Sequence, residues 1–266
     1  MQAVTGVFQA RSDAERALER AYKSGVPADR ITLLTPGSVD SVHKEVQTVP
    51  ADTTEQPGMG KAIGALVGGG VGITGGSLLL ALVPGLGPVT ALGLLGAAIL
   101  GAAGATVGAA AGGRFEGALT EGLPEDEIFV YEDALRKGRS VLVALAQDAD
   151  EAARFTDLMR TANAESIDAA RDQWWIGLRS AEEGHYSKTG RRFSEDEQFF
   201  RLGFESALHA RNRCREFDQI SAEMDAALED VKRRYPGKDV EKPFLHGYQR
   251  GREHYQKLCD ENPKAA

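Results

Sequence analysis

One stretch of the chain carries no ionisable side chain, and it constrains the fold more than any other feature. Between Ala62 and Gly113 there is no Asp, Glu, Lys, Arg or His, and eighteen of the 31 glycines fall within residues 58–113. Glycine recurs at every fourth position of its first half, and a second row of small residues follows a break rich in Pro and Gly. Residues four apart share one face of a helix. We therefore predict a helical hairpin, with helices at 60–83 and 88–113.

The two predicted helices would pack through their small residues, because rows of Gly and Ala let helix backbones approach closely. The predicted packing positions are Gly60, Gly64, Gly68, Gly72, Gly76, Gly93, Ala97, Gly101, Ala105, Ala109 and Gly113. The predicted turn between the helices consists of Pro84, Gly85, Gly87 and Pro88. Tight packing is needed, since glycine destabilises an isolated helix by about 1 kcal/mol relative to alanine. The pattern therefore predicts homo-oligomerisation.

The sequence is consistent with two environments for this hairpin, a lipid bilayer and a soluble assembly. Each helix would be roughly 36–39 Å long, enough to cross a bilayer core of ~30 Å. Lys61 and Arg114 would then lie together on the cytoplasmic side. A re-entrant hairpin, or a soluble oligomer that buries the hairpins against each other, is the alternative. A flexible linker is disfavoured, because linkers are rich in polar residues rather than Leu and Val.

Charge and cysteine content exclude some classes of protein. The net charge is −8, and no segment has the basic excess of a nucleic-acid-binding protein. Two cysteines, Cys214 and Cys259, do not form a disulfide framework, which favours a reducing cytoplasm. The first residues lack a secretory signal pattern. We therefore expect the protein on the cytoplasmic side of the inner membrane, or in the cytoplasm as a large assembly.

The parts before and after the hairpin predict an α+β fold. Residues 3–9 alternate apolar and polar side chains like a strand, a helix capped by Ser12 follows, and 29–35 is a second strand. Beyond the hairpin come a helix at 123–137, a strand at 140–146, a helix at 148–162 and a short strand at 165–170. Two β-α-β units of this kind form a ferredoxin-like sheet with helices on one face. We expect one domain from 1–57 and 114–170, with 58–113 inserted.

Residues 171–266 predict a separate helical domain. Ser194 to Glu197 reads as a capping box ahead of an apolar helix face. A second helix is expected from Asp218 to Tyr235 and a third from near Pro243. Phe200-Arg-Leu-Gly203-Phe204 is echoed by Phe244-Leu-His-Gly247-Tyr248. This echo predicts two duplicated helices that meet at Gly203 and Gly247.

Several of these segments together resemble a known family. They are the VTGVF and SDAERAL segments, the hairpin with its VPGLGP turn, the EGLPEDE to YEDALRKG helix and the VLVALA strand. In this combination residues 3–170 resemble the bacterial general stress protein family, also described as heat-induced stress proteins with a domain of unknown function. The resemblance implies a ferredoxin-like domain, a glycine-rich hairpin and a stress-linked role. It carries over no catalytic residue.

Candidate chemical motifs are weak. Gly70 to Gly75 matches GxGxxG, but no acidic residue follows at the distance that a dinucleotide site needs. Glu182 and His185 have the spacing of one di-iron helix motif, and Glu205 and His209 could share a helix face, but a complete carboxylate site needs further ligands. Cys214 and Cys259 could form a redox pair or a metal site with His209 or His254. We expect solvated polar faces and isolated thiols, and hence no catalytic, cofactor-binding or metal-binding residues.

The sequence therefore favours a non-enzymatic, stress-related protein that self-associates through its helical hairpin at a lipid bilayer. A soluble self-assembling scaffold, such as a ring, shell or filament, is the first alternative. A metal or redox protein built on the C-terminal helices is the second. No small-molecule substrate and no nucleic-acid partner are expected.

Overall fold

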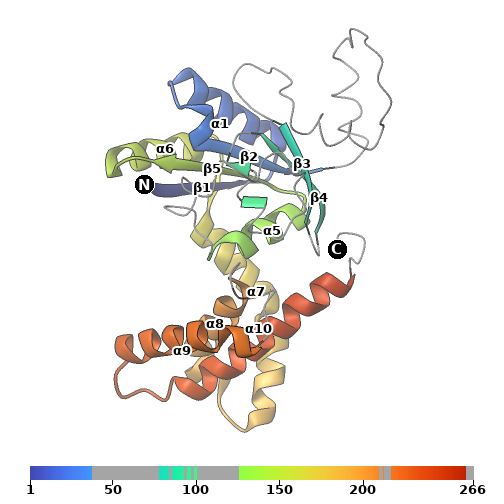
Figure 1. Ribbon diagram of the computed structural model, residues 1–266, viewed down its shortest axis with the longest axis vertical. Coiled ribbons are helices and arrows are strands. Elements are labelled where there is room, and N and C mark those ends of the chain that lie inside the picture. Colours follow the sequence, from blue (N-terminus) through green and yellow to red (C-terminus); the bar gives the residue numbers. More distant parts are fainter. Residues whose placement is uncertain are drawn as a thin grey trace.

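The protein is a mixed α/β molecule in which an antiparallel sheet stands above a group of helices (Figure 1). This computed structural model describes residues 1–37, 78–83, 86–92, 95–96, 99–100, 126–209, 212 and 217–261. The prediction of an α+β fold with an antiparallel sheet is confirmed. Figure 1 shows α7 leading from the sheet down to α8, α9 and α10.

The sheet has six strands in the order β3-β4-β2-β5-β1-β6, and every neighbouring pair is antiparallel. The strands are β1 (Gln2–Phe8), β2 (Ile31–Pro36), β3 (Leu78–Val83), β4 (Gly87–Leu92), β5 (Ser140–Ala146) and β6 (Glu165–Ser166). The fully buried β5 lies between β1 and β2, with Val143 opposite both Thr5 and Thr32. The predicted strand at 165–170 is shorter than expected, because a helix begins at Ile167.

One face of the sheet is covered by α1 (Arg11–Lys23) and α6 (Ala149–Thr161). Each of these helices connects two strands that are not neighbours, β1 to β2 and β5 to β6. A 3₁₀ turn, η1 (Ala28–Arg30), precedes β2. Three of the four buried residues of α1 are alanines, and α6 contributes the larger Phe155 and Met159 to this core.

The opposite face is also covered, by α5 (Ile128–Arg136) and α7 (Ile167–Tyr186). The prediction of helices on one face only is therefore wrong. Phe129 of α5 packs against Trp174 of α7, with 4.7 Å between ring centroids. Trp174 and Trp175 are 5 % and 3 % exposed, so both are core residues. One hydrophobic cluster runs from the sheet through α7 to Phe200 and Phe204, and it joins the sheet to the helical part.

The predicted helical hairpin is wrong for residues 78–83 and 87–92, whereas residues 96, 99 and 100 of the second predicted helix are helical. Residues 78–83 and 87–92 are the strands β3 and β4, which pair with each other and extend the sheet beyond β2. They are joined by a tight connection in which the Leu86 amide donates to the Val83 carbonyl, and Gly87 has a φ of 94°. A turn does occur at the predicted Pro/Gly segment, with Gly87 and Pro88 at the start of β4. All predicted packing positions, from Gly60 to Gly113, lie outside the described residues, as do Pro84 and Gly85.

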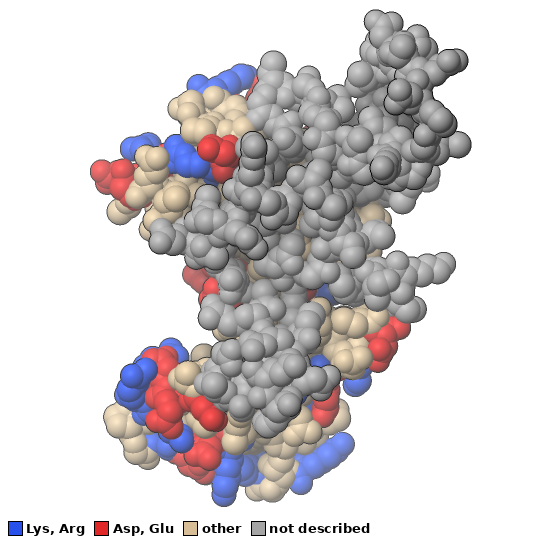
Figure 2. Space-filling model, in the orientation of Figure 1, with Lys and Arg blue, Asp and Glu red and all other residues tan. Residues whose placement is uncertain are grey.

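The remaining helices form the lower part of the molecule. They are α8 (Phe193–Leu208), α9 (Phe217–Arg234) and α10 (Glu241–Glu261), and a 3₁₀ turn, η2 (Ser187–Thr189), follows α7. The predicted domain boundary between residues 170 and 171 falls within α7. Figure 2 shows acidic and basic side chains interspersed over this part on the face in view.

Candidate functional site

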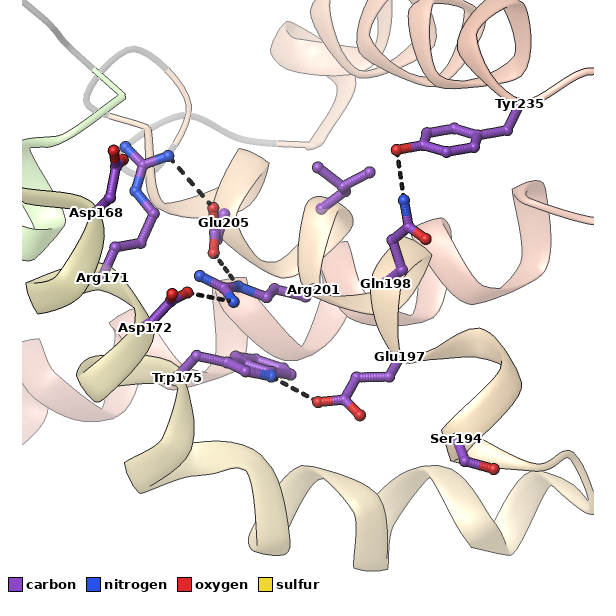
Figure 3. Close-up of a pocket in the computed structure, with 11 residues that line it drawn as sticks. Asp168, Arg171, Asp172, Trp175, Ser194, Glu197, Gln198, Arg201, Glu205 and Tyr235 are labelled. Carbon is purple, nitrogen blue, oxygen red and sulfur yellow. Dashed lines mark hydrogen bonds and ion pairs between the residues drawn. The ribbon is translucent and has the colours of Figure 1, made fainter.

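A groove of about 600 Å³ runs between α7 and α8 (Figure 3). Positions 168, 171, 172 and 175 line it from α7, because residues three and four apart share one face of a helix. The side chains used below are Asp168, Arg171, Asp172 and Trp175 from α7, and Glu197, Arg201 and Glu205 from α8. The groove is thus rich in charge, with an aromatic ring at its centre.

Arg201 ties the two walls of the groove together. Its guanidinium lies 2.9 Å from Asp172 of α7 and 2.6 Å from Glu205 of its own helix. The same guanidinium lies over the Trp175 ring, with 5.8 Å to the ring centroid. Arginine suits this position because its planar group can pair with carboxylates and stack on an aromatic ring at once.

Glu197 is the second bridge across the groove. It accepts a hydrogen bond of 2.9 Å from the Trp175 indole N–H and two bonds of 2.8 Å from the Arg179 guanidinium. The Arg179 hydrogen bonds are the main reason that the pKa of Glu197 lies below its usual value. A carboxylate held ionised in this way is a poor proton donor. These contacts favour a role in fixing α7 against α8.

Arg171 connects the groove to the beginning of α5. Its guanidinium is 3.7 Å from Glu205 and 3.8 Å from Asp126, and it lies 5.8 Å from the Phe129 ring centroid. Next to Asp126, Glu127 accepts a 2.7 Å hydrogen bond from the Tyr131 hydroxyl.

The Tyr131 hydroxyl also lies 2.9 Å from the Thr5 hydroxyl of β1. Burial raises the pKa of Glu127 above its usual value. This carboxyl group is therefore easier to protonate than an exposed one, and it sits where α5 meets the sheet.

The candidate metal ligands that the structure describes are not brought together. Glu182 is 4 % exposed and is held by Arg250 through bonds of 2.8 and 2.9 Å, whereas His185 points to solvent on the same helix. Glu205 is engaged by Arg201, and Cys214 lies outside the described residues. Within the described part of the chain, no three His, Cys, Asp or Glu residues are placed to hold a metal ion.

Two histidines of α10 lie against aromatic rings. His246 is 5.4 Å from Tyr186 and 6.1 Å from Phe200, and His254 is 5.6 Å from Phe204, between ring centroids. Burial is the main reason that the pKa of each lies below 6.5. Positive neighbours act in the same direction, Arg250 on His246 and Arg136 on His254. Both side chains are therefore neutral at neutral pH.

Acidification is expected to destabilise the helical part through these histidines. A group with a lower pKa in the folded protein binds fewer protons there than in the unfolded chain. Its stabilisation is complete above the unfolded value of about 6.5 and is lost as pH falls through the folded value. The free energy of unfolding of wild type should fall more steeply than that of His254→Gln when pH is lowered from about 7.5 to about 5.5. Equal slopes would contradict this role of His254, and comparing the two chains cancels the opposite contribution of Glu127.

The predicted meeting of duplicated helices at two glycines is confirmed. A Cβ atom added to Gly203 would lie 1.9 Å from the Phe244 carbonyl oxygen, and one added to Gly247 would lie 1.9 Å from the Phe200 carbonyl oxygen. Each glycine therefore faces the first residue of the other copy of the motif. Gly251 makes a similar approach to Phe204, at 2.4 Å. The backbones of α8 and α10 are in direct contact at this crossing.

The sheet ends in two very different edges. The β6 edge has only two residues, and its Glu165 is bound to Arg139 at 2.9 Å. The β3 edge has six residues, Leu-Leu-Leu-Ala-Leu-Val, and it pairs with β4 on one side. No other described strand pairs with its second side. Long apolar edge strands are templates for pairing with another chain. The row of small residues predicted a helix here and gave no sign of this strand.

None of the described helices combines the length and apolar character needed to span a bilayer. Compared with known protein families, curated proteins and solved structures, the chain gives no match. The resemblance to the general stress protein family therefore remains a prediction from sequence motifs.

Proposed function

We propose that this chain is a non-enzymatic protein that self-associates through its charge-free stretch, residues 62–113. The observation that carries the proposal is the edge strand β3, whose six residues are all apolar and which lies within that stretch. Native sheets usually protect an edge with charged residues, proline or a very short strand. The β6 edge follows this rule and the β3 edge does not.

The ionic contacts of the helical part support a structural role for its groove. Arg201, Glu197 and their partners bridge α7 and α8 within hydrogen-bonding distance. Glu182, the most buried carboxylate of the candidate metal motif, is occupied by Arg250. We propose on this basis that the assembly surface, and not a catalytic centre, carries the function.

We further propose that the sheet belongs to the ferredoxin-like type. The order β6-β1-β5-β2, with α1 and α6 as crossovers on one face, supports this, because two interleaved β-α-β units define that architecture. The β3–β4 hairpin would then be an addition at the β2 edge. The general stress protein resemblance and a stress-linked role rest on the sequence motifs alone.

Two settings for self-association are compatible with the charge-free stretch, the inner membrane and a soluble scaffold. Fractionation of the untagged protein distinguishes them. Release from membranes by detergent alone supports the bilayer, and a large homogeneous particle without detergent supports the scaffold. A chain that is monomeric in every fraction would refute both.

Bulky substitutions in the glycine row are expected to disperse the assembly. In the double variant Gly68→Leu/Gly72→Leu, two leucines would separate backbones that pack through these positions, so the mass measured by light scattering should fall while the sheet stays folded. The matched control is Gly177→Leu/Gly184→Leu on α7, where an added Cβ meets nothing within 4 Å. The proposal loses this support if both double variants assemble like wild type.

A further inference from the structure

Three residues of β3 direct their backbone hydrogen-bonding groups away from β4, on the side where no other described strand pairs. Successive residues of an antiparallel strand direct their N–H and C=O groups to opposite edges. The Pro88 carbonyl accepts from the Gly37 amide at 2.9 Å, on the β2 side of β4. Positions 88, 90 and 92 of β4 therefore face β2, and positions 87, 89 and 91 face β3. Their partners in β3 are Val83, Ala81 and Leu79.

It follows that Leu78, Leu80 and Leu82 direct their backbone groups away from β4, toward the edge of the sheet. Pro88 has no N–H to donate, so on the β2 side it only accepts from the Gly37 amide, which lies just beyond the end of β2.

From this edge we infer that β3 pairs in antiparallel fashion with β3 of a second copy of the chain, with the two-fold axis at Leu80. The inference rests on the proposed function and specifies its interface. Leu80 would face Leu80 of the other copy, and Leu78 would face Leu82. Three residues of each strand would then exchange backbone hydrogen bonds and form one continuous sheet across two chains.

A second copy fits this edge better than a different partner for two reasons. All pairings in the sheet are antiparallel, so an antiparallel β3–β3 pair continues the existing pattern and closes by two-fold symmetry. A two-fold axis also places residues next to their own equivalents, where like charges would repel. The absence of charge throughout 62–113 removes that repulsion. Head-to-tail stacking on β6 would offer only two residues for pairing.

The first test compares Leu80→Pro with Leu80→Ala in the full chain. Proline removes an N–H from the edge without removing a bond to β4, so the mass should fall at least twofold from that of wild type. Leu80→Ala keeps the N–H and should keep most of the assembly. Assembly of Leu80→Pro equal to that of wild type would overturn the β3 pairing and leave self-association intact. A monomeric wild type would overturn the proposed function as well.

A second test does not depend on how proline is tolerated. In a Cys214→Ser/Cys259→Ser background, Leu80→Cys places two thiols opposite each other, where Cα atoms of a hydrogen-bonded pair are about 5.5 Å apart. A short bismaleimide should link most chains into covalent dimers. The control is Thr161→Cys, an exposed position at the end of α6, which should stay unlinked. Equal linking of both variants, or none of Leu80→Cys, would contradict the two-fold pairing.

Discussion

Replacing Gly203 by alanine is expected to lower the free energy of unfolding by about 3 kcal/mol, at the upper end of what overpacking costs. The new methyl group would lie 1.9 Å from the Phe244 carbonyl oxygen, far inside van der Waals contact. The obstructing atom belongs to the backbone of α10 and not to a flexible side chain, so the two helices must move apart. Chemical denaturation followed by tryptophan fluorescence measures the change in stability, because Trp174 and Trp175 pack on Phe204, the neighbour of Gly203 in α8.

The control for this prediction has the opposite sign. Gly184 lies in α7 with nothing within 4 Å of an added Cβ, so Gly184→Ala should raise stability by up to about 1 kcal/mol through helix propensity alone. Gly247→Ala should be as destabilising as Gly203→Ala, because the two contacts are reciprocal. If Gly203→Ala were as stable as wild type, the close crossing of α8 and α10 would be refuted.

Replacing Arg250 by methionine is the second change with a large expected effect. Arg250 makes two hydrogen bonds of 2.8 and 2.9 Å to Glu182, and the two side chains are 11 % and 5 % exposed. Removing the arginine leaves a buried carboxylate without its main partner, which typically costs 3–5 kcal/mol. The loss should appear as a lower midpoint of denaturation in the helical part.

The double variant Glu182→Leu/Arg250→Met tests whether the loss of stability in Arg250→Met comes from the broken ion pair with Glu182. A buried ion pair can often be replaced by apolar residues at little cost, so the double variant should recover most of the stability lost in Arg250→Met. A double variant as unstable as the single one would mean that Arg250 acts through other contacts, such as its ion pair with Glu253.

Local signals predicted much of the fold. The Asp148 side chain accepts from the Glu151 amide at 2.7 Å and caps α6, in agreement with the helix predicted to begin at residue 148. The helix ending before Gly138 is found, with φ of 78° at that glycine. The Gly203 and Gly247 echo predicted a tertiary contact, because a glycine at the same place in two apolar helices marks where backbones can touch.

The hairpin assignment failed for a physical reason. Leu78–Val83 and Gly87–Leu92 lack the alternation of polar and apolar residues that marks a half-exposed strand, and an apolar run without alternation fits a buried helix or strand equally well. Their length of six residues and the Pro/Gly segment between them favour a β-hairpin. The helical spacing of the glycines before Leu78 led to a predicted helix that wrongly included Leu78–Val83.

Two predicted helix caps also shifted. Helix α1 begins at Arg11 after Ala10, and α8 begins at Phe193 after Arg192, so neither Ser12 nor Ser194 is the N-cap.

The groove between α7 and α8 could not be predicted from the sequence. Arg201, Glu197 and Trp175 meet only because α7 and α8 pack side by side, and sequence spacing within each helix does not reveal the pairing between helices.

The central claim, self-association through the charge-free stretch, is tested most directly by the mass of the full chain in solution. Sedimentation velocity of the untagged protein without detergent, over a dilution series, gives that mass. We predict a species of at least twice the 28.5 kDa of one chain, which persists on dilution. A single species at the mass of one chain throughout the series, with no protein in the membrane fraction, would contradict the claim.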